Sequence, residues 1–374
     1  MDGEHDGYED PGSIRVRRGR GAVSNPAGRF QRQSLEGLDD GWPGDGEAAG
    51  SEAPSTELAP ERARRVISYN RSPDIPFDRS INPYRGCEHG CIYCYARPSH
   101  AYLDLSPGID FETRLRYKEN AAERLRAELA APGYRPAPIA LGVNTDAWQP
   151  AERRLGVTRA ILEVLQEHRH PVTVITKSGL IERDIELLAE MAGDGLVHAS
   201  VSVTTLDPEL HRHLEPRAAG PARRLRIIER LASAGIPVGV MVAPVIPAIN
   251  DHELEAILAE AAGRGARDAG YVGLRLPHEV AGLFADWLRA HYPQRAEHVL
   301  SLIRQSHGGR AYDGGFGTRM RGQGPFAALL GQRFRVACTR HGLDRVGPVL
   351  ETTGFRVPPC RGDQLGLFGD DDAG

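Results

Sequence analysis

Three of the chain's five cysteines lie within one short segment, CEHGCIYC, at Cys87, Cys91 and Cys94. Their C-x₃-C-x₂-C spacing is therefore a feature of this segment and not of a cysteine-rich composition. Three thiolates from one short loop can bind three irons of a four-iron cluster and leave the fourth iron open to a small molecule. The segment predicts a chemically active [4Fe-4S] cluster.

The alternatives to an iron–sulfur cluster lack residues that they need. A structural zinc site would need a fourth Cys or His, typically from a second closely spaced pair. His89 stands between two of the cysteines, where it cannot easily reach the same tetrahedral centre, and Cys338 and Cys360 are remote in sequence. A disulfide framework would need an oxidising compartment and an even number of cysteines. The spacing therefore favours a cluster over zinc, disulfides or incidental thiols.

Polar residues also crowd behind an apolar run in the segment NTDAWQPAE. Asn144, Thr145 and Asp146 are expected to face a ligand, with Gln149 and Glu152 as further polar contacts. The alternative is that Asn, Asp and Pro form a turn and cap the helix that follows.

Lys177 follows another apolar run and is itself followed by Ser178 and Gly179. It could present a cation, with nearby hydrogen-bond donors, to a carboxylate or a ribose, or it could be an exposed lysine in a turn. The next apolar run alternates valine with hydroxyl residues, so one face carries hydroxyls that line either a site or an ordinary core: Ser200, Ser202 and Thr204.

Arg217 comes after this run and could clamp a carboxylate or a phosphate. The arginines of the helix that follows are expected on its solvated outer face: Arg223, Arg224, Arg226 and Arg230. The proline-framed segment 243–251 is suited to form a rigid apolar wall.

The elements that position these residues follow a repeated pattern. Short β-branched runs alternate with helical stretches, which indicates βαβ units and a parallel sheet. Strands are predicted at residues 81–85, 138–144, 172–176, 198–204, 238–242 and 271–276. Helices are predicted at residues 121–130, 156–167, 183–191, 222–234, 252–263, 279–291, 295–305 and 325–341. Because the cysteine segment directly follows the first strand, we expect an α/β fold of the open, partial six-stranded (β/α) barrel type, with its chemistry at the carboxyl ends of the strands.

Composition divides the chain into four regions. Residues 1–62 and 354–374 have no helical or strand periodicity and are expected to be disordered tails. The basic stretch at 15–21 could touch nucleic acid or be a solvated charged tail. Residues 63–292 are expected to form the barrel, and residues 293–353 a helical extension that contains a glycine-rich loop.

Bulk properties exclude several classes of protein. The 374 residues suffice for one barrel-sized domain, and the net charge of −4 argues against a generally basic nucleic-acid binder. Three prolines interrupt the most apolar stretch, residues 234–249, so it is not expected to span a membrane. The acidic N-terminus is unlike a secretory signal, and free thiols suit a reducing compartment, so we expect a cytoplasmic protein.

The motifs NPYRGCEHGCIYCYAR, NTDAWQPAE, TKSG, EPR, AGIPV and APVIPAIND together resemble the radical S-adenosylmethionine (radical SAM) superfamily. Within it they resemble the spore photoproduct lyase-like branch, often labelled DNA repair photolyase, over residues 64–341. The resemblance implies that Cys87, Cys91 and Cys94 ligate the cluster and that Tyr93 lies against the adenine of S-adenosylmethionine. The contacts to S-adenosylmethionine that it implies are Thr145, Asp146, Lys177 and Ser202, with Lys177 foremost.

The same resemblance implies a reaction. One electron, from a reductant such as flavodoxin or ferredoxin, cleaves S-adenosylmethionine to a 5′-deoxyadenosyl radical that abstracts hydrogen from a substrate. A nucleic-acid lesion is the substrate class it suggests. The alternative is an iron–sulfur nucleic-acid-binding or sensor protein without turnover, in which Lys177, Thr145 and Asp146 would be superfluous.

One position departs from the lyases. They carry a hydrogen-donating cysteine at the end of the second strand, where this chain has Val143. Repair of spore photoproduct by the lyase mechanism is therefore not expected. The glycine-rich loop 308–324, with Tyr312, Phe316, Arg319 and Arg321, also departs from a minimal lyase and suits either a substrate lid or a flexible connector.

Overall fold

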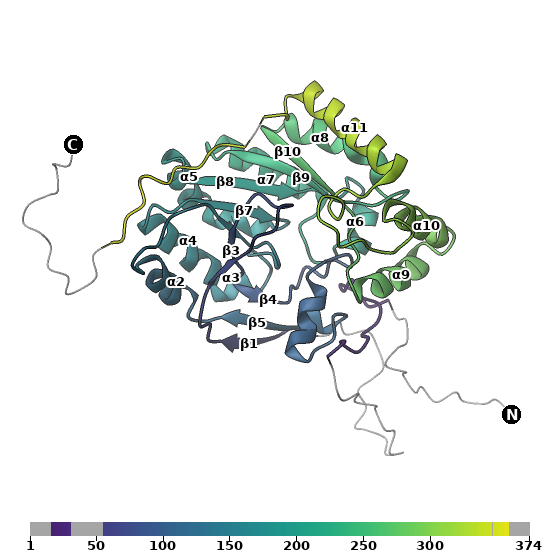
Figure 1. Cartoon of the computed structure of the whole chain (residues 1–374), viewed down its shortest axis with the longest axis horizontal. Helices are drawn as coiled ribbons and strands as arrows, with labels where there is room; N and C mark the ends of the chain where they lie inside the picture. The colour runs from purple at the N-terminus through teal and green to yellow at the C-terminus, as the bar shows by residue number, and fades with distance from the viewer. Residues whose placement is uncertain (1–15, 31–54, 346, 359–374) are drawn as a thin grey trace, which may run out of the picture.

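The computed structural model describes residues 16–30, 55–345 and 347–358, and its centre is a twisted, open sheet (Figure 1). Within this part of the chain the sheet has the order β10-β9-β8-β7-β6-β3-β2, in which β2 is antiparallel to β3 and the other neighbours are parallel. The strands are β2 (Ile67–Tyr69), β3 (Arg79–Ile81), β6 (Ile139–Leu141), β7 (Val172–Thr176), β8 (Val197–Ser202), β9 (Val238–Val245) and β10 (Asp268–Gly273). Six parallel strands in sequence order confirm the predicted open barrel fold.

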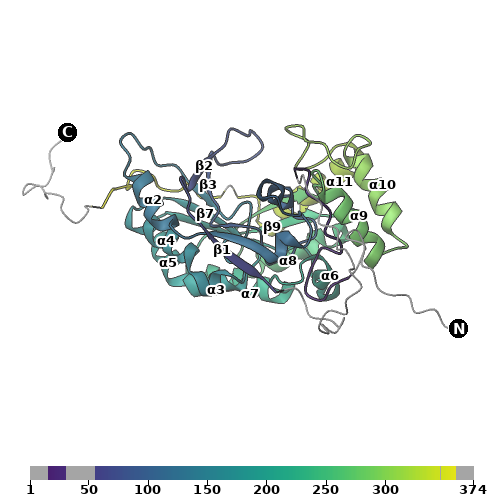
Figure 2. The ribbon, with the colours of Figure 1, turned by 90° about the horizontal axis from the view of Figure 1, so that it is seen from below.

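Helices cover one face of this sheet, the lower face in Figure 2. Those that follow the strands are α2 (Ala121–Leu129), α3 (Glu152–Leu155), α4 (Val157–Glu167), α5 (Ile185–Gly193), α7 (Pro221–Ser233) and α8 (Leu254–Ala262). Helix α4 shows why they pack there. Its apolar residues recur at helical spacing, and Ile161, Leu162 and Leu165 are all buried.

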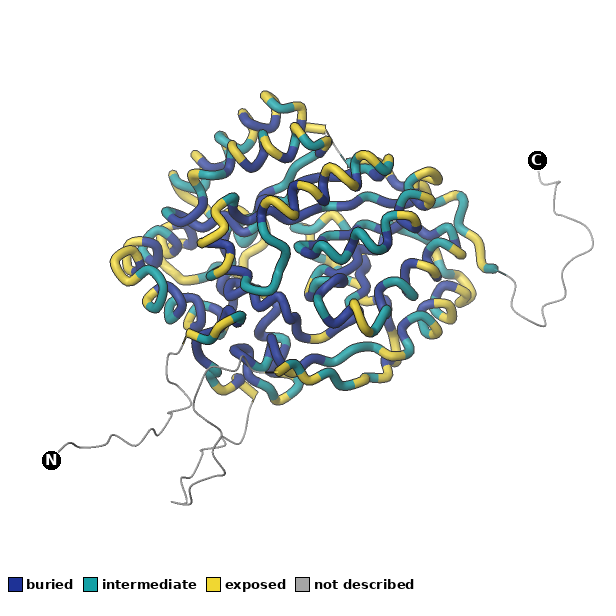
Figure 3. The backbone as a smooth tube through the Cα atoms, turned by 180° about the vertical axis from the view of Figure 1, so that it is seen from behind, coloured by how far each residue is buried: buried dark blue, intermediate teal, exposed yellow. Residues whose placement is uncertain are grey.

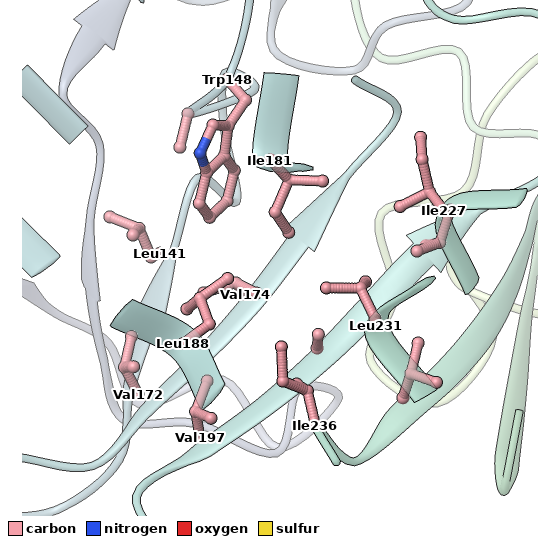
Figure 4. Close-up of a cluster of buried hydrophobic side chains, with 14 of the residues drawn as sticks. Leu141, Trp148, Val172, Val174, Ile181, Leu188, Val197, Ile227, Leu231 and Ile236 are labelled. Carbon is pink, nitrogen blue, oxygen red and sulfur yellow. The ribbon is translucent and has the colours of Figure 1, made fainter. Parts of the chain in front are cut away.

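The main core lies between these helices and the sheet. Side chains from β7 and β8 meet residues from α5 and α7, as with Val174, Leu188 and Ile227 (Figure 4). Burial of each such side chain contributes about 1.5–3 kcal/mol relative to exposure. The tube coloured by burial shows the strands mostly buried and the outer helix surfaces exposed (Figure 3).

A second core forms beside the first, under the helical extension. It contains residues of α9 (Val280–His291) and α10 (Ala296–Ser306), among them Trp287 and Ile303. Ile92, from the middle of the cysteine segment, is fully buried in this core. The extension, which ends with α11 (Gly324–His341), therefore packs against the same loop that carries the cysteines. Helix α6 (Pro208–Leu214) contributes Leu210 and Leu214 to the same core.

The first predicted strand, 81–85, is corrected. It is divided between β3 and β4 (Tyr84–Arg85), and β4 belongs to a separate small sheet with β1 (Glu57–Glu61) and β5 (Arg114–Lys118). Pro83 has no N–H to donate to a ladder, so the strand is interrupted there. The connection from the cysteine segment to β5 contains η1 (Arg97–Leu103) and α1 (Asp110–Thr113).

The predicted disordered tails are corrected where the structure describes them. Arg20, Ala22 and Val23 are buried, β1 pairs in parallel with β5, and Phe355 packs against the main core. Backbone pairing and tertiary burial order these segments even though their sequences carry no periodicity. Residues 1–15, 31–54 and 359–374 lie outside the described residues, as does Cys360.

In the described part, no helix is both long and apolar enough to cross a membrane.

Candidate active site

The three cysteines are presented by a loop of tight turns between β4 and η1. The N–H of Gly90 donates to the carbonyl of Cys87 (3.3 Å), and the N–H of Cys94 donates to that of Cys91 (3.1 Å). Gly90 has a φ of +67°, a conformation that favours glycine. Cys87 and Cys91 are buried and Cys94 is partly buried. The backbone therefore holds all three thiols within one compact loop.

These thiols suit an iron–sulfur cluster. Burial raises the pKa of each one, so metal binding at neutral pH must displace their protons. Among the described residues, no three His, Cys, Asp or Glu side chains converge as ligands of a single ion. Ligands of a four-iron cluster each bind a different iron, so the cysteines need not converge. The apolar surroundings, which include Phe111 and Ala96, also fit such a group.

A fully buried ion pair supports the cysteine loop. Arg97 donates to Oε1 of Glu112 (2.5 Å) and to the carbonyls of Gly90 (3.2 Å) and Cys91 (3.0 Å). Glu112 also accepts from the backbone N–H groups of Gly21 and Ala22 (3.0 and 2.8 Å). This N-terminal segment lies so close to the loop that a Cβ at Gly21 would be 1.8 Å from the Gly90 carbonyl oxygen. The described part of the basic stretch, residues 16–21, therefore packs against the cysteine loop through Gly21.

Gln149 and Glu152, predicted as further ligand contacts, instead brace the scaffold. Gln149 is fully buried, accepts from the N–H of Glu88 (2.9 Å) and donates to the carbonyl of Gly86 (3.2 Å). Glu152 is also fully buried and binds the Tyr84 hydroxyl and Arg183. In this structure the polar atoms of both side chains are therefore bound to protein groups of the scaffold.

Asp146 connects three segments. It accepts from the hydroxyl of Thr176 (2.8 Å) and from the N–H of Lys177 (2.7 Å), and it lies 3.5 Å from Nδ1 of His89. Thr145 is buried and donates its hydroxyl to the carbonyl of Tyr84 (3.1 Å). Both residues thus hold the ends of β6 and β7 beside the cysteine loop. Their direct contact with a cofactor stays a prediction.

Lys177, at the carboxyl end of β7, is brought together with residues from β8 and β9. Its Nζ lies 2.6 Å from the Ser202 hydroxyl, 3.3 Å from that of Thr204 and 3.1 Å from the Ala243 carbonyl. It is also 5.7 Å from the centre of the Tyr93 ring. The side chain is 16% exposed, so Lys177 is not a solvated turn lysine. The predicted set Tyr93, Lys177 and Ser202 forms one group.

Glu215, which the sequence analysis did not single out, is the centre of this group. It is fully buried, accepts from the hydroxyls of Tyr93 and Thr204, and lies 3.2 Å from Nζ of Lys177. Burial alone would raise the pKa of Glu215, but Arg224 and Lys177 outweigh it and hold that pKa well below its usual range. Burial raises the pKa of the Tyr93 phenol well above its usual range, and the nearby Cys91 and Glu215 raise that pKa further. The group therefore carries a carboxylate and a neutral phenol.

Arg224 corrects the expectation of a solvated arginine face on α7. It is 1% exposed, binds Glu215, and donates to the carbonyls of Ala219 (2.7 Å) and Ser202 (3.0 Å). A signal was available in the sequence. Arg224 stands four and seven residues before Ile228 and Leu231, on the buried stripe of the helix.

The carbonyl of Val143, which follows β6 in the chain, accepts a hydrogen bond from the Tyr95 hydroxyl. Tyr95 is partly exposed, and the guanidinium of Arg275 lies 4.7 Å from its ring centre. Cys338, on α11, is buried in the main core among its apolar residues. Tyr95 therefore links the segment after the last cysteine to the end of β6 through its hydroxyl.

The glycine-rich loop 308–324 bridges to the opposite edge of the sheet. Arg319 lies 2.6 Å from Oδ2 of Asp74 and stacks 4.9 Å from the ring centre of Phe316, and the N–H of Gly317 donates to Asp74 (2.7 Å). Asp74 belongs to the connection between β2 and β3. Both loops lie on the side away from α3 and α7 (Figure 2).

Comparison with known proteins identifies the class. The family model of the Radical SAM superfamily matches residues 81–261 of this chain. An uncharacterized protein of Mycobacterium tuberculosis is 40% identical over 233 residues, which are 62% of this chain and 68% of the relative. An uncharacterized protein of Methanocaldococcus jannaschii is 24% identical over 197 residues, 53% of this chain and 71% of the relative. The chain belongs to the radical SAM superfamily, whose members bind S-adenosylmethionine and an iron–sulfur cluster.

Solved structures show which fold the chain shares. A spore photoproduct lyase complexed with dinucleoside spore photoproduct aligns with a TM-score of 0.54 at 16% identity, covering 76% of this chain and 79% of that one. A lyase variant with bound AdoMet and the same lesion gives a TM-score of 0.54 at 15% identity and the same coverage. The fold is thus similar to that of spore photoproduct lyase.

Proposed function

We propose that this protein is a radical SAM enzyme that uses a [4Fe-4S] cluster on Cys87, Cys91 and Cys94. When bound, such a cluster supplies the electron that cleaves S-adenosylmethionine to a 5′-deoxyadenosyl radical. The observation that carries the proposal is the buried group of Lys177, Ser202 and Tyr93 around Glu215, at the strand ends beside the cysteine loop. An iron–sulfur sensor would have no use for it.

The chain's own residues have distinct tasks in this proposal. Lys177 supplies a cation and Ser202 a hydroxyl to the carboxylate or ribose of S-adenosylmethionine. Glu215 holds Tyr93 and Lys177 in position, and Asp146 fixes the backbone of Lys177 through its N–H. Because the carboxyl ends of β7, β8 and β9 meet here, these groups are positioned before a ligand arrives.

The substrate class that we propose is a nucleic-acid lesion. Its support is the fold shared with a lyase whose structure contains dinucleoside spore photoproduct. Val143, which has no S–H bond, stands where the resemblance places a cysteine, so the reaction is proposed to end differently from clean lyase repair.

The test is anaerobic reconstitution with iron and sulfide, followed by dithionite and an assay for 5′-deoxyadenosine. Cys87→Ala, Cys91→Ala and Cys94→Ala should each abolish the four-iron chromophore and 5′-deoxyadenosine. Cys338→Ala is the matched control, because that thiol is buried in the distant main core. Loss of the chromophore in Cys338→Ala, or a reconstituted parent that never forms 5′-deoxyadenosine, would contradict the proposal.

A further inference from the structure

A cleft of about 560 Å³ reaches the cysteine loop from the helix-covered side of the sheet. One of its lining residues is His89, which stands between Cys87 and Cys91 and is 2% exposed. Other lining residues come from α3, from η2 (Gly179–Asp184), from the segment that leads into α7 and from α7 itself. These elements lie on the lower face in Figure 2, away from the glycine-rich loop.

The end of β7 separates this cleft from the Glu215 group. Lys177 sends its side chain to Ser202 and Thr204, whereas the next two residues, Ser178 and Gly179, line the cleft. The end of β7 would therefore lie between a molecule in the cleft and one held by Lys177.

Exposed guanidinium groups surround the cleft, and the carboxylates that pair with them are buried. The lining includes one glutamate, Glu182, and these arginines: Arg153, Arg183, Arg217, Arg223 and Arg230. The side chains of Arg223 and Arg230 are 47% and 59% exposed and share Glu182, which is 9% exposed. Arg217 pairs with Glu88 (7% exposed) and Arg183 with Glu152 (fully buried). Positive charge therefore faces solvent, while negative charge faces the protein.

We propose that this arginine cleft docks a small acidic protein that carries one electron at a time, such as a flavodoxin. The proposal rests on the proposed function. The docked carrier is oxidised by one electron, and the group held by the three cysteines is reduced by it, with no bond made or broken. Complementary charge steers such an encounter and speeds association.

A nucleic acid would also bind exposed arginines through its phosphates. The position of the cleft favours the carrier. A nucleic-acid substrate must bring its hydrogen to the side on which Lys177 and the strand ends lie, whereas a carrier needs only to reach the cysteine loop. His89, which lines the cleft, is part of that loop.

The decisive variant is Arg223→Glu/Arg230→Glu, which reverses two exposed charges at the rim. Its control is Arg126→Glu/Arg264→Glu, which makes the same change in total charge at two surface arginines that pair with Glu167 and Glu260 and do not line the cleft. Folding of both variants is compared by thermal unfolding. Arg153→Glu serves as a second cleft variant.

Two measurements test docking separately from catalysis. Binding of oxidised flavodoxin to the metal-free protein should weaken about tenfold in the cleft variant at low salt, and by less than about twofold in the control. Bleaching of the reconstituted cluster by reduced flavodoxin should slow to a similar extent, while bleaching by dithionite stays unchanged.

Other outcomes would overturn docking. Unchanged flavodoxin binding and electron transfer in both cleft variants would do so, as would a parent protein that does not bind flavodoxin. A cleft variant that loses binding of a labelled oligonucleotide but keeps flavodoxin binding would assign the cleft to nucleic acid instead. Failure of the proposed function is distinguishable, because it would appear as no 5′-deoxyadenosine with dithionite in parent and variants alike.

Discussion

Two buried arginine–glutamate pairs lie beside the cysteine loop, and their glutamates bind different kinds of partner. Arg97–Glu112 is saturated by backbone: Glu112 accepts from two N–H groups of the N-terminal segment, and Arg97 donates to carbonyls of the cysteine loop. In Arg224–Glu215 the arginine also binds carbonyls, but the glutamate binds side chains: Tyr93, Thr204, Lys177 and His211.

The difference separates a scaffold from a site. A pair whose hydrogen bonds beyond the pair itself all go to backbone groups holds the chain in one shape. A glutamate bound to a partly exposed lysine and to hydroxyls can exchange those partners when a ligand arrives. We infer that Arg97–Glu112 shapes the loop and that Glu215 organises its interior side.

The largest effect is expected at the scaffold. Arg97→Met leaves Glu112 buried without its counter-ion and should lower the free energy of unfolding by about 3–5 kcal/mol, with loss of bound iron. Arg126→Met, at an exposed pair, should change it by less than about 1 kcal/mol. Denaturant unfolding of the metal-free proteins measures both. Equal stability of the two variants would remove the distinction between the pairs.

A smaller and different effect is expected at the site. Lys177→Met should weaken S-adenosylmethionine binding by about 2 kcal/mol, because it removes a charge-assisted contact to the carboxylate. Iron content should stay at the parent level. Equilibrium binding to the reconstituted protein checks this, and unchanged affinity in a folded, iron-loaded variant would return Lys177 to a structural role.

Acid should also weaken the scaffold before the site. Burial lowers the pKa of His100, in η1 beside Arg97, to about 4. The unfolded chain has a histidine pKa of about 6.5, so between these values it binds a proton that the folded protein does not. Stability from His100 is therefore present above about pH 6.5 and is lost as the pH falls toward 4, whereas Glu215, with its depressed pKa, stays charged.

The size of this acid effect is about 2 kcal/mol by pH 5. Denaturant midpoints of the metal-free protein at pH 7, 6 and 5 give the slope. His100→Gln should make it shallower without removing it, because burial also lowers the pKa of His170 and of His291 to about 4. A slope that is unchanged in the variant would place the titrating group elsewhere.

The smallest effect on stability is expected from Val143→Cys, less than about 1.5 kcal/mol, because the two side chains are similar in volume. The substitution should mainly change which product the reaction forms. The parent should make 5′-deoxyadenosine anaerobically without cleanly reverting spore photoproduct to two thymines, and the variant should increase clean repair. Chromatography of the products decides, and efficient clean repair by the parent would reveal another hydrogen donor.

Sequence patterns predicted most of the fold because those patterns are local. Strand β7 and helices such as α4 and α9 lie within one residue of their expected bounds, since apolar periodicity is read over a few turns. The small sheet was missed. Its strands are short and pair across distant segments, as β1 does with β5, so no local pattern marks them.

The sequence by itself determined the cysteine loop that we propose binds the cluster, because its three cysteines lie within one turn-rich segment whose spacing needs no distant partner. Only the tertiary structure decided which polar residues join it. Gln149 and Glu152 were drawn into the scaffold, while Glu215 and Arg224 became the centre of the site. The reason is physical: parallel strands bring their carboxyl ends together from segments far apart in sequence, and a charged residue can be buried wherever a partner compensates it.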